Sequence, residues 1–214
     1  MNDYLAQRRE LISACLRLAE QGYLAGTGGN LAMRLDAAHF AVTPSAADYY
    51  ALAPAHIAVL RLDTLEQVGG ELPPSVETGL HAAMLRGVPM SASVHTHQPL
   101  ASALSLVNVP LPRGEGSGVR ALGAAVALVP YAPSGTSLLV RALRRRLRPH
   151  VHAYLLRNHG VICRAPDLEA AIALVGRIER AAAAVLRERA SRLLPTAHPL
   201  RVLALAALPQ GETP

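Results

Sequence analysis

Apolar residues recur at helical spacing in several segments of the chain. In the first segment Leu5, Ile12 and Leu16 fall on one side of a helix, and Gly22 supplies a stop. Pro73-Pro74-Ser75 is a suitable start for the second helix, because proline is well accommodated in a first helical turn. The spacing predicts helices over residues 3–22, 75–86, 99–106, 134–147 and 167–192.

Shorter apolar or alternating runs between these helices predict β-strands. Residues 31–35 alternate, and a turn around Asp36 joins them to the next run, which together predict a hairpin. The pair Gly69-Gly70 predicts a turn. The expected strands cover residues 31–35, 39–43, 57–62, 91–95, 125–129, 152–156 and 161–163.

The order of these elements predicts an α/β fold. Helices alternate with strands without one repeated βαβ period, so we expect a mixed sheet covered by helices on both faces. A chain of 214 residues fits one compact domain. We therefore expect a single domain over residues 1–194, and we place the C-terminal tail, residues 195–214, at a subunit interface.

The composition removes several kinds of chemistry. All 21 positive charges are arginine, because the sequence contains no lysine. A Schiff-base aldolase, a pyridoxal-phosphate enzyme and a Walker-type phosphate loop each need a lysine amine, so carbanion chemistry would need a metal ion instead. Cys15 and Cys163 lie far apart with no second pair, which favours buried reduced thiols over a disulfide or a cysteine-rich zinc site.

A net charge of +6 and a pI near 10.0 raise the question of nucleic-acid binding. Residues 141–148, however, end an amphipathic helix where positive charge complements the helix dipole, and no aromatic residue interleaves with them for base stacking. On the last helix, arginines are interspersed with Glu179 and Glu188. We interpret this stripe as a solvated face or a subunit contact, and we expect no nucleic-acid partner. With no apolar run near the roughly 18 residues that cross a bilayer, and no signal-peptide pattern, we expect a cytoplasmic protein without a membrane partner.

The first candidate site is Val94-His95-Thr96-His97, at the end of a predicted strand. Residues two apart on a strand project from the same face, so the two imidazoles can bind one metal ion. His150-Val151-His152 has the same spacing. It lies beside Arg148 and Pro149 at the exposed start of a strand, and we interpret it as a pair of surface histidines.

A third ligand and a carboxylate are also available. Asn158-His159-Gly160 lies between two apolar strands, where glycine permits a tight turn, and three neutral imidazoles would leave zinc an open coordination position. Glu77 falls in the first turn of a predicted helix, with His81 four residues later on the same face. Taken singly, Glu77 is more simply a partner of the helix dipole and His81 a packed histidine, so these alternatives stay open.

The chain thus carries, in order, Gly26-Thr27-Gly28-Gly29-Asn30-Leu31-Ala32, Thr43-Pro44-Ser45, Pro74-Ser75-Val76-Glu77 with His81, His95-Thr96-His97 and Asn158-His159-Gly160. In this order and spacing the motifs resemble the class II aldolase/adducin family over about residues 5–190. The resemblance implies a three-layer α/β/α sandwich with a mixed, largely antiparallel central sheet. It also implies a homotetramer with active sites at subunit interfaces.

The resemblance assigns a role to each motif. It implies that His95, His97 and His159 bind zinc and that Glu77 is the acid/base group, which can also touch the resting metal. A substrate phosphate would lie where loop N–H groups, hydroxyls and a helix N-terminus gather, against Gly28, Gly29, Asn30, Ser45 and Ser75.

Three departures from the family pattern concern the substrate. Val76 stands where the phosphate site has a second serine, and Ser45-Ala46 stands where the loop usually ends in Ser/Thr-Gly. Where the aldolases use a tyrosine in proton transfer, this chain has Arg113-Gly114-Glu115-Gly116. Glu115 or Arg113 could take the role, although loop charges facing water are the simpler interpretation.

These features predict a zinc-dependent aldolase that cleaves a small ketose phosphate or a related hydroxy-carbonyl sugar acid through a metal-stabilised enediolate, with Glu77 transferring the proton. A dehydratase, decarboxylase or 4-epimerase of a sugar phosphate could use the same site. A non-catalytic scaffold like the adducin head is the alternative of another class, and the presence of all three histidines and Glu77 argues against it. Zinc is the expected cofactor, with another divalent metal as the alternative.

Overall fold

The structure is a computed structural model, and it describes residues 4–24, 26, 28–107, 111 and 126–208. Its helices are α1 (Leu5–Glu20), α2 (Thr78–Leu85), α3 (Pro99–Leu106), α5 (Ser137–Arg146), α6 (Leu168–Leu193) and α7 (Pro199–Ala207), with short 3₁₀ turns at Tyr49–Ala51 and Pro54–His56. The strands are β1 (Asn30–Arg34), β2 (His39–Val42), β3 (Ala58–Arg61), β4 (Gln67–Gly69), β5 (Ala92–Thr96), β6 (Val126–Val129), β7 (Ala153–Leu156) and β8 (Gly160–Ala165).

The described strands form one eight-stranded sheet in the order β4-β3-β2-β1-β5-β8-β7-β6. Every neighbouring pair is antiparallel except β6 and β7, which run parallel. The prediction of a mixed, largely antiparallel sheet is therefore confirmed. Strands β1, β5 and β8 occupy its middle, where both faces are covered and all five residues of β5 are buried.

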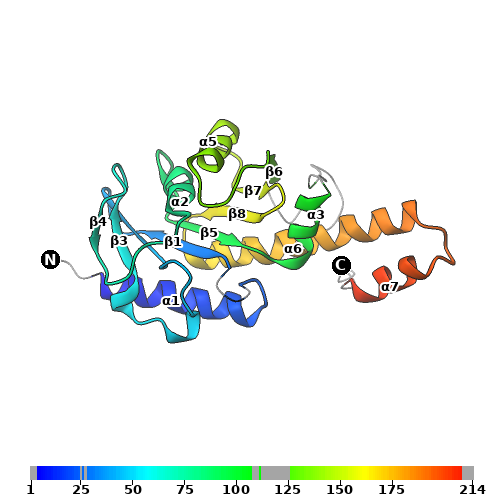
Figure 1. Cartoon of the computed structure of the whole chain (residues 1–214), viewed down its shortest axis with the longest axis horizontal. Coiled ribbons are helices and arrows are strands. Elements are labelled where there is room, and N and C mark those ends of the chain that lie inside the picture. The colour runs from blue at the N-terminus through cyan, green and yellow to red at the C-terminus, as the bar shows by residue number, and fades with distance from the viewer. Residues whose placement is uncertain (1–3, 25, 27, 108–110, 112–125, 209–214) are drawn as a thin grey trace.

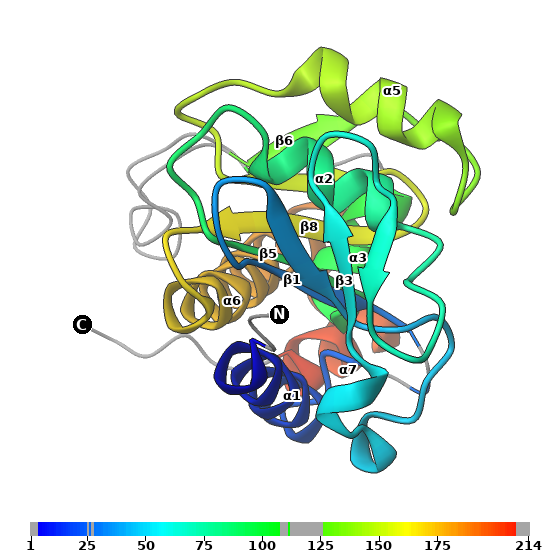
Figure 2. The same ribbon diagram turned by 90° about the vertical axis from the view of Figure 1, so that its left-hand side faces the viewer.

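Helices cover both faces of the sheet and make three layers (Figures 1 and 2). On one side α1, α3 and α6 pack against the middle strands around a large apolar core. On the other side α2 and α5 pack together over a second core that includes Leu80, Leu139 and Tyr154. The predicted α/β/α sandwich is confirmed, and its core is aliphatic, as expected from a chain with 3% aromatic residues.

The predicted helices start and end within a few residues of the observed ones, and two of them have a side-chain N-cap in the sequence. Asp167 caps α6 by accepting the backbone N–H of Ala170 at 2.7 Å, and Thr136 caps α5. Two helices begin three residues later than predicted: α5 at Ser137 rather than residue 134, and α2 at Thr78 rather than residue 75. The N–H of Ser75 instead donates to the carbonyl of Thr43 at 3.1 Å, so this segment is extended beside residues 43–45.

Two elements of the structure were not predicted from the sequence. Gly69 ends a short edge strand, β4, and the chain turns at Gly70, whose φ of +89° favours glycine. The tail forms a helix that the sequence interpretation did not predict: α7 packs on α6, and Arg187 Nη1 donates to the carbonyl of Leu205 at 2.8 Å. No helix of the described ranges is long and apolar enough to span a membrane. Both cysteines are buried and free, as predicted.

Candidate metal centre and active site

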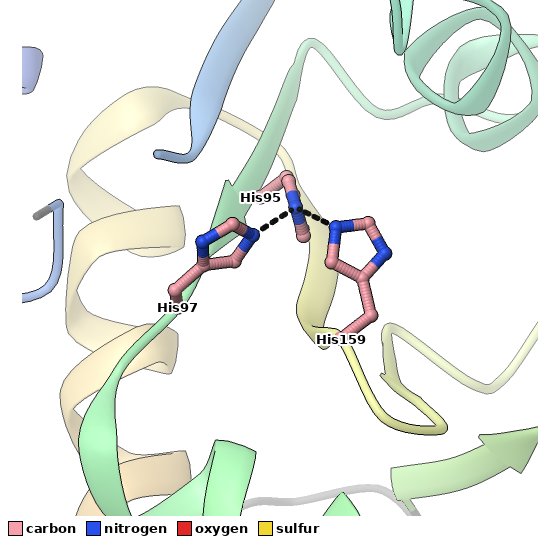
Figure 3. Close-up of side chains that lie close together, drawn as sticks. All are labelled: His95, His97 and His159. Carbon is pink, nitrogen blue, oxygen red and sulfur yellow. Dashed lines mark hydrogen bonds between the residues drawn. The ribbon is translucent and has the colours of Figure 1, made fainter. Parts of the chain in front are cut away.

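Three histidines converge at one end of the middle strands. His95 is the fourth residue of β5, His97 follows the strand by one residue, and His159 lies in the turn between β7 and β8. The Nε2 atom of His95 lies 3.0 Å from that of His97 and 3.2 Å from that of His159 (Figure 3). The ligand atoms of all three lie within 4.8 Å of one another, so the structure brings together the predicted metal ligands.

The protonation of this cluster fits a metal ion. His95 Nδ1 lies 2.7 Å from the carbonyl oxygen of Val161, which can only accept, so Nδ1 carries the ring proton and Nε2 is bare. Burial lowers the pKa of His95 to about 3 and also lowers the pKa of His97, which keeps both rings neutral. Neutral imidazole nitrogens about 2.0 Å from one ion would lie about 3.3 Å apart, close to the two separations measured from His95.

Gly160 explains how the His159 turn approaches β5 so closely. A Cβ atom at this position would lie 2.8 Å from Cδ2 of His97 and would overlap the carbonyl oxygen of Thr96. The turn itself needs Asn158 in the left-handed region, at φ +56°, where asparagine is better tolerated than most residues. The Asn-His-Gly sequence therefore has a steric reason on each side of the histidine.

Glu77 completes the cluster from the other face. It occupies the N-cap position of α2 without capping the helix through its side chain. Its Oε2 lies 3.2 Å from Nε2 of His95, and its Oε1 lies 3.3 Å from Nε2 of His159. The interpretation of Glu77 as a mere dipole partner is therefore wrong, because its carboxylate turns away from the helix and toward the histidines.

Two donors hold the Glu77 carboxylate. Asn30 Nδ2 donates to Oε2 and the Ser134 hydroxyl donates to Oε1, each at 2.9 Å. Burial raises the pKa of Glu77, whereas the nearby imidazoles and the hydrogen bonds from Asn30 and Ser134 lower it, and the net result is a pKa lowered to about 2. The group is therefore a carboxylate at neutral pH. Ser134 was missed by the sequence interpretation, since a serine in a proline- and glycine-rich loop carries no signal of its own.

His81 is a packed histidine, the simpler of the two interpretations offered by the sequence. It is completely buried, and its ring points to Asn30 and Ser93 rather than to the three-histidine cluster. The His150-Val151-His152 pair likewise takes no part in the described cluster: His150 is exposed and His152 half-buried before β7.

The segments that carry the residues expected to bind the phosphate lie next to one another. The segments around Leu31, Thr43 and Ser75 are joined by backbone hydrogen bonds, and the Tyr49 hydroxyl donates to the carbonyl of Gly29. The N–H groups of Ser45 and Ser75 are both bonded to backbone carbonyls, and the Ser75 hydroxyl accepts the N–H of Glu77 at 3.2 Å, so the Ser45 and Ser75 amides are not available to a phosphate.

The departures from the family pattern also have structural counterparts. Val76 is 68% exposed and contacts the segment at Gly135. Ala46 has a left-handed backbone with φ +50°, the conformation that glycine would adopt without strain. Arg113 and Glu115 lie outside the residues that the structure describes.

The segment that carries His97 is tied to α6. Gln98 Nε2 donates to the carbonyl of Val175 at 3.0 Å, and the Glu179 carboxylate accepts the N–H groups of Leu100 and Ala101 in the first turn of α3. The interpretation of the stripe of arginines and glutamates on α6 as a solvated face or a subunit contact therefore does not apply to Glu179, which is 8% exposed and bonded within the chain.

Comparison with known proteins identifies the family. A family model described as Class II Aldolase and Adducin N-terminal domain matches residues 9–186. The chain is 30% identical over 175 residues to a 5-deoxy-D-ribulose 1-phosphate aldolase of Bacillus thuringiensis, covering 81% of each chain. It is 33% identical over 166 residues to a methylthioribulose-1-phosphate dehydratase of Yersinia pseudotuberculosis, covering 72% of this chain and 74% of the relative.

A solved structure gives the same result for the fold. A structure of L-fuculose 1-phosphate aldolase superimposes with a TM-score of 0.77 at 27% identity, and the match covers 93% of this chain and 94% of the other. The matched region contains all three histidines and Glu77. The chain therefore belongs to the class II aldolase and adducin family.

Proposed function

We propose that this protein is a metal-dependent lyase that cleaves a carbon–carbon bond in a small, anionic, sugar-derived substrate by a retro-aldol reaction. The observation that carries the proposal is the convergence of three imidazole Nε2 atoms with the Glu77 carboxylate, which lies 3.2 and 3.3 Å from two of them. A scaffold protein has no need for a buried carboxylate held against two members of a three-histidine cluster.

His95, His97 and His159 would hold the ion, and zinc suits three neutral imidazoles with an open position. The bound ion would supply the Lewis-acid charge that polarises a substrate carbonyl, a task for which this lysine-free chain has no amine. Val161 supports the ligand set by fixing the proton of His95 on Nδ1.

Glu77 would transfer the proton in the cleavage reaction, and its surroundings favour Oε1 as the carboxylate atom that carries this proton. The Asn30 NH₂ group can only donate, so Oε2 is kept as an acceptor on that side. The Ser134 hydroxyl at Oε1 donates to the carboxylate and can rotate to accept when the acid is protonated. A proton on Oε1 is therefore accommodated without breaking the contact with Asn30.

The substrate class follows from the relatives and from the polar loops around the site. Both sequence relatives act, by their names, on phosphorylated ketoses. The anionic group would be bound by Gly28, Gly29, Asn30, Ser45 and Ser75. Val76, an exposed apolar side chain where the family pattern has a serine, would offer this group one hydroxyl fewer. We also propose a homo-oligomeric enzyme of the cytoplasm, with residues 195–214 contributing to the contact between subunits.

Dehydration is the second candidate, since the dehydratase relative is 33% identical. Elimination of water would use the same proton transfer by Glu77 but would leave the carbon chain intact. Mass spectrometry of the products separates the two reactions, because aldol cleavage gives two shorter carbonyl compounds and dehydration gives one product of unchanged carbon number.

The decisive experiment is the metal content of freshly purified protein, measured beside His159→Ala and His152→Ala. We expect about one zinc ion per chain in the parent and in His152→Ala, and little in His159→Ala. That result would justify a screen of ketose phosphates for aldehyde release. A folded parent that neither contains zinc nor takes it up would overturn the enzyme proposal and favour the scaffold.

A further inference from the structure

A line of buried hydrogen bonds runs from β5 to the Glu77 carboxylate. Ser93 Oγ lies 2.8 Å from His81 Nδ1, His81 Nε2 lies 2.7 Å from Asn30 Oδ1, and Asn30 Nδ2 lies 2.9 Å from Glu77 Oε2. Ser93 and His81 are completely buried, and Asn30 and Glu77 are 7% and 5% exposed. These four groups come from three segments of the chain, because Asn30 is in β1, Ser93 is in β5, and Glu77 and His81 are both part of α2 and its N-cap. Their alignment is therefore a property of the tertiary fold.

The chemistry of each group fixes the direction of every hydrogen bond in the line. An ionised carboxylate only accepts, so the NH₂ group of Asn30 must face Glu77 and its carbonyl must face His81. The amide carbonyl also only accepts, so His81 must carry its proton on Nε2. His81 Nδ1 is then bare and accepts the hydroxyl proton of Ser93. Burial lowers the pKa of His81 to about 4, in keeping with a ring that stays neutral.

We propose that His81 is a positioning residue, which orients the Asn30 amide and through it holds Glu77 Oε2 as an acceptor in the active site. This inference rests on the proposed role of Glu77. Without the Nε2–H of His81, the Asn30 carbonyl loses its partner and the amide can rotate to place its oxygen beside the carboxylate. Glu77 would then face repulsion at Oε2 and leave the position in which it approaches His95 and His159.

The proposal can be tested first without any substrate. Long-range ¹H–¹⁵N spectra of the full-length labelled protein report which ring nitrogen of each histidine is protonated, and the signals missing in His81→Gln identify His81. We expect one tautomer, with the proton on Nε2. A proton on Nδ1, or a mixture of tautomers, would overturn the proposal whether or not the protein is an aldolase.

Two variants then test the link to catalysis. Glutamine at position 81 can still donate to Asn30, whereas leucine fills the space without a donor. Because small displacements of a catalytic group cost about a hundredfold in rate, we expect kcat for cleavage to fall about tenfold to a hundredfold in His81→Leu. His81→Gln should restore most of that loss, with zinc content unchanged in both.

The outcomes separate the two proposals. If the parent cleaves no ketose phosphate, the proposed function fails while the spectra still decide the orientation of His81. If both variants lose activity to the same degree while folded and zinc-loaded, the shape of the ring matters rather than its donor, and the positioning role is wrong. Equal activity of His81→Leu and the parent would also refute it.

Discussion

Glu179 on the long helix α6 holds the turn that follows His97. Its two carboxylate oxygens lie 2.7 Å from the backbone nitrogen of Leu100 and 3.0 Å from that of Ala101, the first free N–H groups of α3. A side chain from another helix thus takes the place of an N-cap, because Gln98 makes no side-chain cap of its own. The position of one candidate metal ligand therefore depends on a carboxylate far along the chain.

Removal of this carboxylate should loosen the His97 turn. Because hydrogen bonds to a charged acceptor contribute about 2 kcal/mol, Glu179→Ala should lower the free energy of unfolding by about 2–4 kcal/mol and weaken zinc binding. Glu179→Gln, which keeps one acceptor oxygen, should lose about half as much. Urea denaturation and competition with a zinc chelator measure the two effects. Glu188→Gln, exposed on the same helix, is the control, and an equal loss there would contradict the capping role.

Gly160→Ala should damage the metal site directly. The added methyl group would press on the His97 ring and on the backbone of Thr96, so one of them must move. We expect an affinity for zinc about tenfold to a hundredfold weaker, similar to the loss of a group that supports a ligand. Gly176→Ala is the matched control, because a Cβ there meets nothing closer than 3.6 Å and should stabilise α6 by up to about 1 kcal/mol. Unchanged zinc affinity in Gly160→Ala would show that the turn can relax.

His81 should make the metal-free protein sensitive to mild acid. A histidine in an unfolded chain has a pKa near 6.5, whereas burial lowers the pKa of His81 to about 4. As the pH falls between these values the unfolded chain binds a proton that the native chain cannot, so stability is lost by about 1.4 kcal/mol per pH unit. Other buried histidines also contribute to this dependence of the free energy of unfolding on pH. The contribution of His81 is isolated by urea denaturation of the parent and of His81→Gln at about pH 7, 6 and 5. Parallel profiles for the two proteins would contradict the assignment.

Ala46→Gly should stabilise the protein. Ala46 has φ +50°, and a left-handed conformation costs a residue with a Cβ about 1–2 kcal/mol. Glycine avoids this cost but loses more conformational entropy on folding, so we expect a net gain of about 0.5–1 kcal/mol in the free energy of unfolding. Ala47→Gly, one residue further and without a positive φ, should instead destabilise by up to about 1 kcal/mol. Thermal denaturation of the pair decides the sign, and a loss in both variants would mean that Ala46 is not strained.

The parts of the site that the sequence predicts are those set by local geometry. His95 and His97 lie two apart at a strand end, so the alternation of a strand puts them on one face, and the Asn-His-Gly turn has its own backbone requirements. The helices and strands of the sandwich follow from periodicity and from caps such as Asp167. The family resemblance supplied what periodicity could not, namely that these distant segments meet.

The missing parts depend on contacts between segments far apart in the chain. Asn30 and Glu77 are 47 positions apart, and nothing in either segment indicates that one donates to the other. The stripe of charges on α6 similarly gave no sign of which face meets α3, so Glu179 was assigned with the arginines to a solvated face or a subunit contact. Helix α2 begins late because the backbone of Ser75 pairs with Thr43, a long-range bond that competes with local helix signals.

The placement of the histidines at the ends of neighbouring central strands also bears on folding. His95 and His159 are separated by 64 positions, and the strand pairing of β5 with β8 is what brings them together. An ion held there would act as a crosslink that exists only in the folded chain, and at a free concentration a hundred times its dissociation constant it would add about 2.7 kcal/mol to stability. The amount of folded protein would then rise and fall with the metal supply, so that a shortage of metal would reduce the protein itself as well as its activity.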